Sequence, residues 1–264
     1  MNIETQIKNR VGHLYFEAYN GAMDLAHLER LLEAYQGLAN SAEVRLILLW
    51  GGEEFFSNGI DLLSIDQRYN PTLLAYRNLK GINRFIEALL TNDKQLLMAG
   101  LRGPAAAGGV MLALAADLRY AAPSVVLNPH YVNMGLSGSE YFSLLLPQLV
   151  GLGRAQALLL EAAPLSAEQA VRLGLLHETI APAIFKEELT IRAEFLANHQ
   201  FEARLATKNL LLGPLRQQMP ELVKAELLAM KSLCDQPGFA QARADFINKK
   251  PSPSFAQVAR RNLR

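Results

Sequence analysis

The sequence holds only one cysteine, Cys234, among its 264 residues. A single thiol cannot close an internal disulfide, and Cys234 has no partner at metal-ligand spacing, so neither a disulfide framework nor a cysteine-based zinc site is expected. We expect Cys234 to be a packing residue in a reducing, cytoplasmic compartment.

An excess of positive or of negative charge is also missing, since Lys and Arg total 26 against 25 for Asp and Glu. With no basic surplus to neutralise phosphates, nucleic acid is not an expected partner.

Long hydrophobic runs are absent as well. The most apolar stretches, residues 110–116 and 144–146, end well before the roughly 18 residues that are needed to span a bilayer. The first ten residues are polar and charged, and they lack the regions of a secretory signal. The sequence therefore predicts a soluble protein of the cytoplasm with no membrane partner.

What the sequence does contain is the alternating pattern of an α/β protein. Residues 44–50 (VRLILLW) are almost all apolar and are followed by two glycines, which is typical of a strand buried on both faces. Similar short runs occur at residues 95–99 and 125–127. Apolar residues at helical spacing occur at residues 25–38 and 71–90. Strands that alternate with helices in this way favour an α/β architecture.

The strand patterns stop after about residue 181. Residues 185–234 predict successive helices, and the Gly213-Pro214 dipeptide predicts a break between them. Residues 236–255 predict one more short helix between proline-rich ends. We therefore expect an α/β core over residues 1–195 and a helical region over residues 196–264.

A segment of small residues, 103–116 (GPAAAGGVMLALAA), follows a predicted strand and leads into a predicted helix. Glycine permits close backbone approach, and backbone N–H groups at such a turn can face an oxygen that gains negative charge. Tight packing explains the segment equally well. Because no Gly-Lys-Ser/Thr sequence follows and the G-x-G-x-x-G spacing is missing, nucleotide hydrolysis and NAD chemistry are disfavoured.

Polar side chains are concentrated in residues 128–140 (NPHYVNMGLSGSE), between a predicted strand and a predicted helix. Such a cluster lines a site or caps a helix, and Ser137 or Ser139 is expected to be the N-cap of the next helix. The G-x-S-x-G pattern of a serine hydrolase fails because position 139 is serine. No two histidines have zinc-protease spacing, so no metal site is expected. The remaining histidines are expected on the surface or in packing: His13, His27, His177 and His199.

Two of these segments together resemble the oxyanion-hole segments of the crotonase (enoyl-CoA hydratase/isomerase) superfamily. Residues 58–61 (NGID) are similar to the family's A-G-x-D element, and residues 107–109 (AGG) are similar to its G-G-G element. Further similarity at residues 165–176 extends the resemblance to nearly the whole chain. On this match the two donors are the backbone N–H groups of Ile60 and Gly108.

The resemblance implies a ββα spiral core over residues 1–195 and a C-terminal helical trimerisation region over residues 196–264, assembled as a homotrimer or a dimer of trimers. It also implies an acyl-CoA substrate whose thioester carbonyl is polarised by the two N–H groups. Coenzyme A is then part of the substrate, and no permanently bound cofactor is expected. The residues implied to contact the substrate are Asn58, Gly59, Gly109, Met111, His130, Phe246 and Lys249.

The two catalytic glutamates of enoyl-CoA hydratases are missing from this sequence. The first aligns with Met111, which cannot transfer a proton. The second aligns with Tyr131, or with His130 if the gap is placed one residue earlier. Ordinary hydration is therefore disfavoured. Glu140 is the carboxylate that remains nearby; a helix start would favour its ionised form, and burial would oppose it.

Short strings at residues 19–23, 56–60, 127–131 and 138–141 resemble one branch of the superfamily, the crotonase-like C-terminal domain of HypX-type hydrogenase-maturation proteins. That branch implies release of carbon monoxide from formyl-CoA, with Tyr131 and Glu140 as catalytic side chains. The formyl-tetrahydrofolate-handling domain of those proteins is not in this sequence, so formyl-CoA is expected to come from elsewhere. Two alternatives stay open: an enoyl-CoA hydratase or isomerase with an unconventional acid/base, and an inactive CoA-binding protein.

Overall fold

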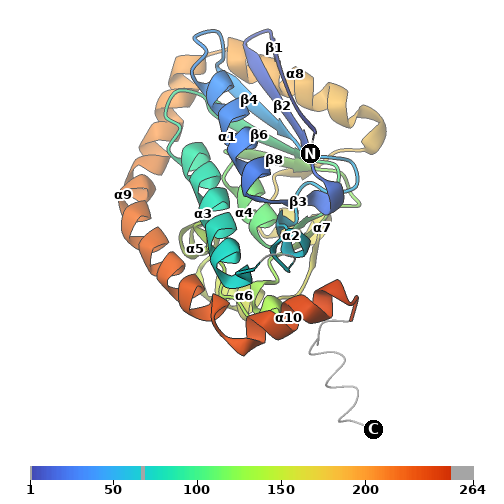
Figure 1. The fold of residues 1–264 in the computed structure, drawn as a ribbon. Helices are drawn as coiled ribbons and strands as arrows, with labels where there is room; N and C mark the ends of the chain where they lie inside the picture. Colours follow the sequence, from blue (N-terminus) through green and yellow to red (C-terminus); the bar gives the residue numbers. More distant parts are fainter. Residues whose placement is uncertain (1, 67–68, 251–264) are drawn as a thin grey trace.

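The computed structural model describes residues 2–66 and 69–250, which fold around a six-stranded sheet (Figure 1). The strand order is β1-β2-β4-β6-β8-β11. The first two strands form an antiparallel hairpin whose turn residues, Asn9 and Arg10, both have positive φ, and the other neighbours are parallel. The strands are β1 (Asn2–Lys8), β2 (Val11–Glu17), β4 (Leu46–Trp50), β6 (Leu96–Leu101), β8 (Leu118–Ala121) and β11 (Glu178–Thr179).

Four successive parts of the chain repeat one unit: a strand of the large sheet, a short strand outside it, and a helix. The short strands pair among themselves, β3 with β5 and β7 with β9, which also pairs with β10 (Leu165–Ser166). This is the ββα spiral that the resemblance implied, and every strand and helix predicted within it lies within two residues of its observed bounds. The short strands are β3 (Ala22–Met23), β5 (Gly59–Ile60), β7 (Ala105–Ala106) and β9 (Val126–Asn128), and the helices are α1 (Leu25–Ala39), α3 (Pro71–Leu90), α4 (Gly108–Leu114) and α5 (Phe142–Val150).

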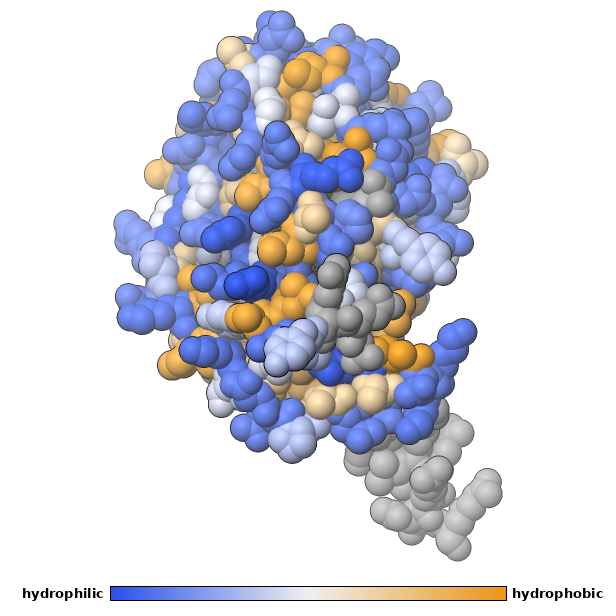
Figure 2. All heavy atoms as spheres, in the orientation of Figure 1, coloured by the Kyte–Doolittle hydropathy of each residue, from blue (hydrophilic) through white to orange (hydrophobic). Residues whose placement is uncertain are grey.

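The central strands are apolar throughout because both faces of the sheet are covered. In β4, Ile47 and Leu49 pack with α1 and α3, whereas Leu46, Leu48 and Trp50 pack against α8 (Phe185–Asn198). Figure 1 shows α1 in front of the sheet with α3 packed next to it, and α8 beside the other face. The outward sides of α1 and α3 are largely polar, and Figure 2 shows a largely hydrophilic surface that hydrophobic patches interrupt.

Local capping signals set the start of the two large helices over the sheet. Asp24 accepts a hydrogen bond from the N–H of His27 at the start of α1. Asn70 does the same for the N–H of Leu73 at the start of α3, and Pro71 occupies the first turn of that helix. The N-termini of α1 and α3 are therefore fixed by residues next to them in the sequence.

The C-terminal part is helical, and the predicted break at Gly213-Pro214 is wrong. Helix α9 (Phe201–Cys234) continues through Pro214 and Pro220. A proline inside a helix costs about 3 kcal/mol, and contacts of α9 with the core on both sides of the two prolines offset this cost. Cys234 is buried, as predicted. The other α-helices are α2 (Leu62–Asp66), α6 (Leu152–Glu161), α7 (Ala167–Arg172) and α10 (Pro237–Ile247).

The predicted helix within residues 236–255 is α10; residues 251–255 lie outside the described part of the chain. The predicted boundary between residues 195 and 196 lies inside α8, and its role as a domain boundary stays a prediction. No helix in residues 2–66 and 69–250 is long and apolar enough to cross a bilayer.

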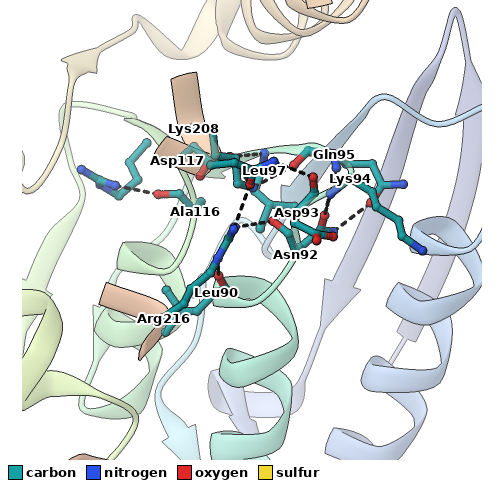
Figure 3. Close-up of polar contacts among 12 residues, drawn as sticks. Leu90, Asn92, Asp93, Lys94, Gln95, Leu97, Ala116, Asp117, Lys208 and Arg216 are labelled. Atoms are coloured by element: carbon teal, nitrogen blue, oxygen red, sulfur yellow. Dashed lines mark hydrogen bonds and ion pairs between the residues drawn. The ribbon is translucent and has the colours of Figure 1, made fainter. Parts of the chain in front are cut away.

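A buried polar network anchors the first half of α9 to the sheet and to α3 (Figure 3). Lys208 Nζ lies 2.8 Å from Asp117 Oδ2, and the same oxygen accepts a hydrogen bond from the N–H of Leu97 at 2.7 Å. Arg216 donates to the carbonyl oxygen of Leu90, the last residue of α3, at 2.9 Å. Because these partners belong to β6, α3 and the start of β8, they fix α9 relative to the core.

Candidate active site

A cavity of about 470 Å³ lies between the short strands and the C-terminal helices. Its mainly apolar wall comes from η1 (Tyr19–Gly21), β5, α2 (Leu62–Asp66), the β7–α4 turn, η2 (Tyr131–Met134), α9 and α10. Figure 2 shows hydrophobic atoms near the position at which Figure 1 draws α2 and α10. The predicted site residues that line the cavity are Asn58, Ile60, Gly108, His130, Tyr131, Glu140 and Phe246.

The first predicted donor, the N–H of Ile60, points away from strand β3. The next N–H, that of Asp61, donates to the carbonyl oxygen of Met23 in β3 at 2.9 Å. Successive N–H groups of a strand point to opposite edges, so the N–H of Ile60 faces the other side. Gly59 precedes it with a φ of +77°, and a Cβ on Gly59 would lie 3.2 Å from the backbone N of Gly108. The two predicted donor segments are therefore in contact.

The second predicted donor, the N–H of Gly108, follows a strained residue. Ala107 has φ +47° and ψ −126°, a conformation that residues with a Cβ rarely adopt and that costs roughly 1–3 kcal/mol. Its own N–H is held by the carbonyl oxygen of Asn128 at 2.9 Å, and its carbonyl oxygen accepts from the N–H of Val110. This turn sets the direction of the peptide that carries the N–H of Gly108, on the cavity wall.

Glu140 contributes a buried carboxyl group to the cavity, and its side chain lies against Gly108. Only 1% of its surface is exposed, and its Oε2 accepts a hydrogen bond from the N–H of Ser139 at 3.0 Å. Burial raises the pKa of Glu140 to about 7; the negative charge of Glu226 acts in the same direction, whereas the hydrogen bond from the N–H of Ser139 and the nearby Tyr131 hydroxyl oppose it. Burial, which was expected from the sequence to oppose ionisation of Glu140, is the largest of these effects. A Cβ on Gly108 would lie 3.0 Å from Glu140 Oε1.

Tyr131 places a second buried polar group beside this carboxylate. Its side chain is 4% exposed, and the hydroxyl has no hydrogen bond of good geometry to any described residue. Burial, and then the charge of Glu140, hold the pKa of Tyr131 well above its ordinary value. The hydroxyl therefore stays protonated and has a hydrogen bond to give.

The start of α5 is capped by a distant helix rather than by the predicted serines. The N-cap is Tyr141, which has φ +60° and no capping hydrogen bond from its own side chain. Two N–H groups of this turn, including that of Tyr141, donate to the carboxylate of Glu226 on α9. The prediction of Ser137 or Ser139 as the N-cap is wrong, because the positive φ at Glu140 and at the N-cap delays the start of the helix past both serines.

Four residues predicted to contact the substrate do not line the cavity. Gly59 and Gly109 lie behind its wall, where a Cβ on Gly109 would come within 1.9 Å of the carbonyl oxygen of Ser57. Met111 is fully buried in the main hydrophobic core. Lys249 is exposed beyond the end of α10.

The other predicted side chains lie on the cavity wall. Asn58 Nδ2 donates to the carbonyl oxygen of Asn20 at 2.6 Å, which ties β5 to η1. His130 Nδ1 lies 2.9 Å from the carbonyl oxygen of Asn128. Phe246, on α10, is 53% exposed. Helix α10 thus contributes an aromatic side chain to the cavity of its own chain.

Several residues of the site were not identified from the sequence. His27, expected on the surface or in packing, lines the cavity, and so does Met230 of α9. Asn83 Oδ1 accepts the N–H of Glu140 at 2.8 Å. Asn83 could have been noticed, because it is a polar residue on the apolar side of α3, next to Ile82. Nothing in the local sequence singled out Glu226, whose contacts lie some 85 residues away.

Comparison with known proteins supplies the family of this chain. The family model described as enoyl-CoA hydratase/isomerase matches residues 8–257. The hydrogenase maturation factor HoxX of Bradyrhizobium diazoefficiens is 33% identical over 250 residues, which are 91% of this chain and 44% of HoxX. HypX from Aquifex aeolicus in complex with tetrahydrofolic acid superimposes with a TM-score of 0.88 at 33% identity, covering 94% of this chain and 45% of that one. An enoyl-CoA hydratase from Bacillus halodurans shares the fold, with a TM-score of 0.83 at 23% identity over 92% of this chain and 98% of its own. The chain spans less than half the length of the HoxX and HypX proteins.

Proposed function

Because this chain belongs to the enoyl-CoA hydratase/isomerase family, we propose that its cavity binds an acyl-CoA thioester, with the N–H groups of Ile60 and Gly108 as the oxyanion hole for the thioester carbonyl. Two fixed donors suit an oxygen that gains charge in the transition state, and losing one such donor can cost about 3 kcal/mol. The crotonase fold and the HypX-like branch were both predicted from the sequence and are confirmed by the relatives. The choice of acyl group depends on the side chains around the two donors.

The reaction that we propose is cleavage of formyl-CoA to carbon monoxide and CoA. One observation carries it: the buried Glu140 carboxyl group lies beside Gly108, so a base stands next to a donor at which the carbonyl of a formyl group would be seated. Glu140 takes the formyl proton, and the electron pair of the C–H bond stays on carbon. The C–S bond breaks with its pair on sulfur, and the proton then passes from Glu140 to the thiolate. Atoms and charge balance without an oxidant or a reductant.

Tyr131 is the second side chain to which we give a role. Its buried hydroxyl lacks a well-formed hydrogen bond and remains protonated, so it can donate to the ionised Glu140 or to the sulfur as the thiolate leaves. A buried hydroxyl without a partner costs about 1–3 kcal/mol, and a substrate that accepts its hydrogen bond recovers this energy. Tyr131 is therefore suited to stabilise the charge that the reaction moves from carbon to sulfur.

We also infer a role in hydrogenase maturation, because HoxX is named a hydrogenase maturation factor and HypX is similar to this chain over 94% of its length. The chain spans less than half of these proteins. The source of formyl-CoA is therefore assigned to an activity outside residues 1–264.

The experiment is to incubate the purified protein with formyl-CoA and to trap released carbon monoxide on reduced haem, whose absorption spectrum reports the gas. We expect release by the wild type and a loss of roughly 100-fold or more in Glu140→Gln, because the proton acceptor is gone. Glu221→Gln is the matched control, since it removes an exposed carboxylate from α9 and should leave the rate unchanged. Equal release by Glu140→Gln and the wild type would contradict the proposal.

A hydratase or isomerase of longer enoyl-CoA thioesters is the second candidate, favoured by the mainly apolar wall of the cavity. Turnover of crotonyl-CoA or of a 3-enoyl-CoA that depends on Glu140 would support it. Binding of CoA without turnover of any of these thioesters would support an inactive CoA-binding protein instead.

We further propose that the chain assembles as trimers or as pairs of trimers. Large hydrophobic side chains are exposed on α8 and α9, and such surfaces mark interaction sites when they gather in patches. Light scattering should give three or six times the chain mass of 29.1 kDa, and a monomeric mass would contradict this assembly. The exposed side chains are Ile191, Phe195, Leu210, Leu211 and Leu228.

A further inference from the structure

Glu226 is a buried carboxylate that the proposed reaction does not use. It lies in the second half of α9 and is 5% exposed, although glutamate is almost never fully buried without partners. Its two oxygens accept hydrogen bonds from the N–H groups of Tyr141 and Ser143, both at 2.9 Å, and from the Ser143 hydroxyl. All three donors belong to the residues that directly follow Glu140. A carboxylate of the C-terminal helical region is therefore bound to the backbone that carries the proposed proton acceptor.

The backbone at Glu140 needs such support because it is strained. Glu140 and Tyr141 have φ values of +62° and +60°, and the left-handed conformation costs roughly 1–2 kcal/mol for each residue with a Cβ. Asn83 of α3 accepts the N–H of Glu140 at 2.8 Å, and Glu226 of α9 accepts the N–H of Tyr141. The two acceptors come from different helices and hold consecutive peptide groups. Together they fix the direction in which the Glu140 side chain leaves the backbone.

The second effect of Glu226 is its charge. Among the described residues, the titratable groups that face Glu140 are Tyr131 from η2 and Glu226 from α9. From α3 it is contacted by Asn83, and from α4 by the backbone of Gly108, neither of which titrates. Two neighbouring carboxylates resist ionising together. Burial raises the pKa of Glu226 too, but three hydrogen bonds at the start of a helix oppose this rise. Glu140 receives only one hydrogen bond from a backbone N–H, so the arrangement favours ionisation of Glu226 first.

We propose that Glu226 is a positioning residue for Glu140: its carboxylate holds the left-handed turn that carries the Glu140 side chain, and its negative charge disfavours a second negative charge on Glu140. The inference rests on the proposed function, because Glu140 can both take and return a proton there if it titrates near the working pH. The anchors of α9 at Lys208 and Arg216 (Figure 3) keep the helix in the register that brings Glu226 to the site.

The test is an infrared titration of the carboxyl groups without any substrate. Each protein is compared with its own Glu140→Gln counterpart, so that the difference spectrum isolates the C=O band of protonated Glu140. We expect a midpoint near pH 7 in the wild type and a midpoint lower by about one pH unit in Glu226→Gln, because a neighbouring negative charge has been removed. The matched control is Glu221→Gln, an exposed residue on the same helix, which should leave the midpoint in place.

Two further variants keep the test decisive if Glu226→Gln does not fold. Ser143→Ala removes one donor from Glu226 and makes that group harder to ionise, so the Glu140 midpoint should fall by a smaller amount. Glu226→Asp retains the charge and should keep the midpoint close to that of the wild type. If Glu226→Gln folds and its Glu140 midpoint is unchanged, the proposal is overturned. If only Ser143→Ala folds, an unchanged Glu140 midpoint in that variant overturns it. A Glu140 midpoint that falls as much in Glu221→Gln as in Glu226→Gln would overturn it as well. Because no thioester is present, failure of formyl-CoA cleavage leaves this result unaffected.

Discussion

Replacing Glu140 by glutamine should make the folded protein more stable at alkaline pH, although the same change removes the proposed proton acceptor. The pKa of Glu140 rises from an ordinary 4.5 to about 7 on burial, so the folded state holds its proton more tightly than the unfolded state does. The contribution of Glu140 to the free energy of unfolding is fully present below about pH 4.5 and is lost as the pH rises through 7. At about 1.4 kcal/mol for each pH unit between the two values, the loss is about 3.5 kcal/mol. Glutamine is neutral at every pH, so the variant loses no stability at this position as the pH rises.

The assay is urea unfolding of the wild type and of Glu140→Gln at pH 5 and at pH 8, at one protein concentration because subunit assembly would also affect stability. The difference in free energy of unfolding between the two proteins should change by about 2.5 kcal/mol between these pH values, in favour of the variant at pH 8, since a small part of the loss has already occurred at pH 5. Carboxylates with a lowered pKa, such as Asp245, act with the opposite sign but are present in both proteins. A difference that stays constant between pH 5 and pH 8 would refute the assignment of Glu140 as a buried acid with a raised pKa.

Three other substitutions test separate parts of the structure. Tyr131→Phe should release carbon monoxide at least roughly 10-fold more slowly. Its melting temperature should stay close to that of the wild type, because the hydroxyl makes no well-formed hydrogen bond in the free protein. An unchanged rate would show that Tyr131 has no role in the reaction. Gly109→Ala should prevent stable folding, measured by circular dichroism, since its Cβ would lie 1.9 Å from the carbonyl oxygen of Ser57; a native spectrum and melting curve would contradict this contact. Lys208→Met should cost about 3–5 kcal/mol in urea unfolding because it leaves Asp117 partly buried without its cation, and a cost below about 1 kcal/mol would show that the pair does not anchor α9.

Part of the fold was predictable from local signals, although β1, β2, β8 and β11 of the large sheet were not identified in this way. The apolar run of β4 and the spacing of apolar residues in α1 and α3 report burial directly, and each element was predicted to within two residues. The break at Gly213-Pro214 was predicted by a local rule that tertiary contacts of α9 overrode. The capping serines failed for a similar reason, since the positive φ at residues 140–141 arises from contacts with α3 and α9.

The sequence by itself indicated an α/β architecture and the two glycine-bearing turns, because strand burial and tight turns leave their pattern in neighbouring residues; the family, and with it the ββα spiral, followed from the resemblance of those motifs. Only the tertiary structure decided what surrounds those turns. It brought Glu140 against Gly108, moved Met111 into the core, and joined Glu226 to the site across some 85 residues of chain. The physical reason is that the ionisation of a buried carboxyl group depends on solvent exclusion and on charges from every element packed around it. Such surroundings have no counterpart in the spacing of residues along the sequence.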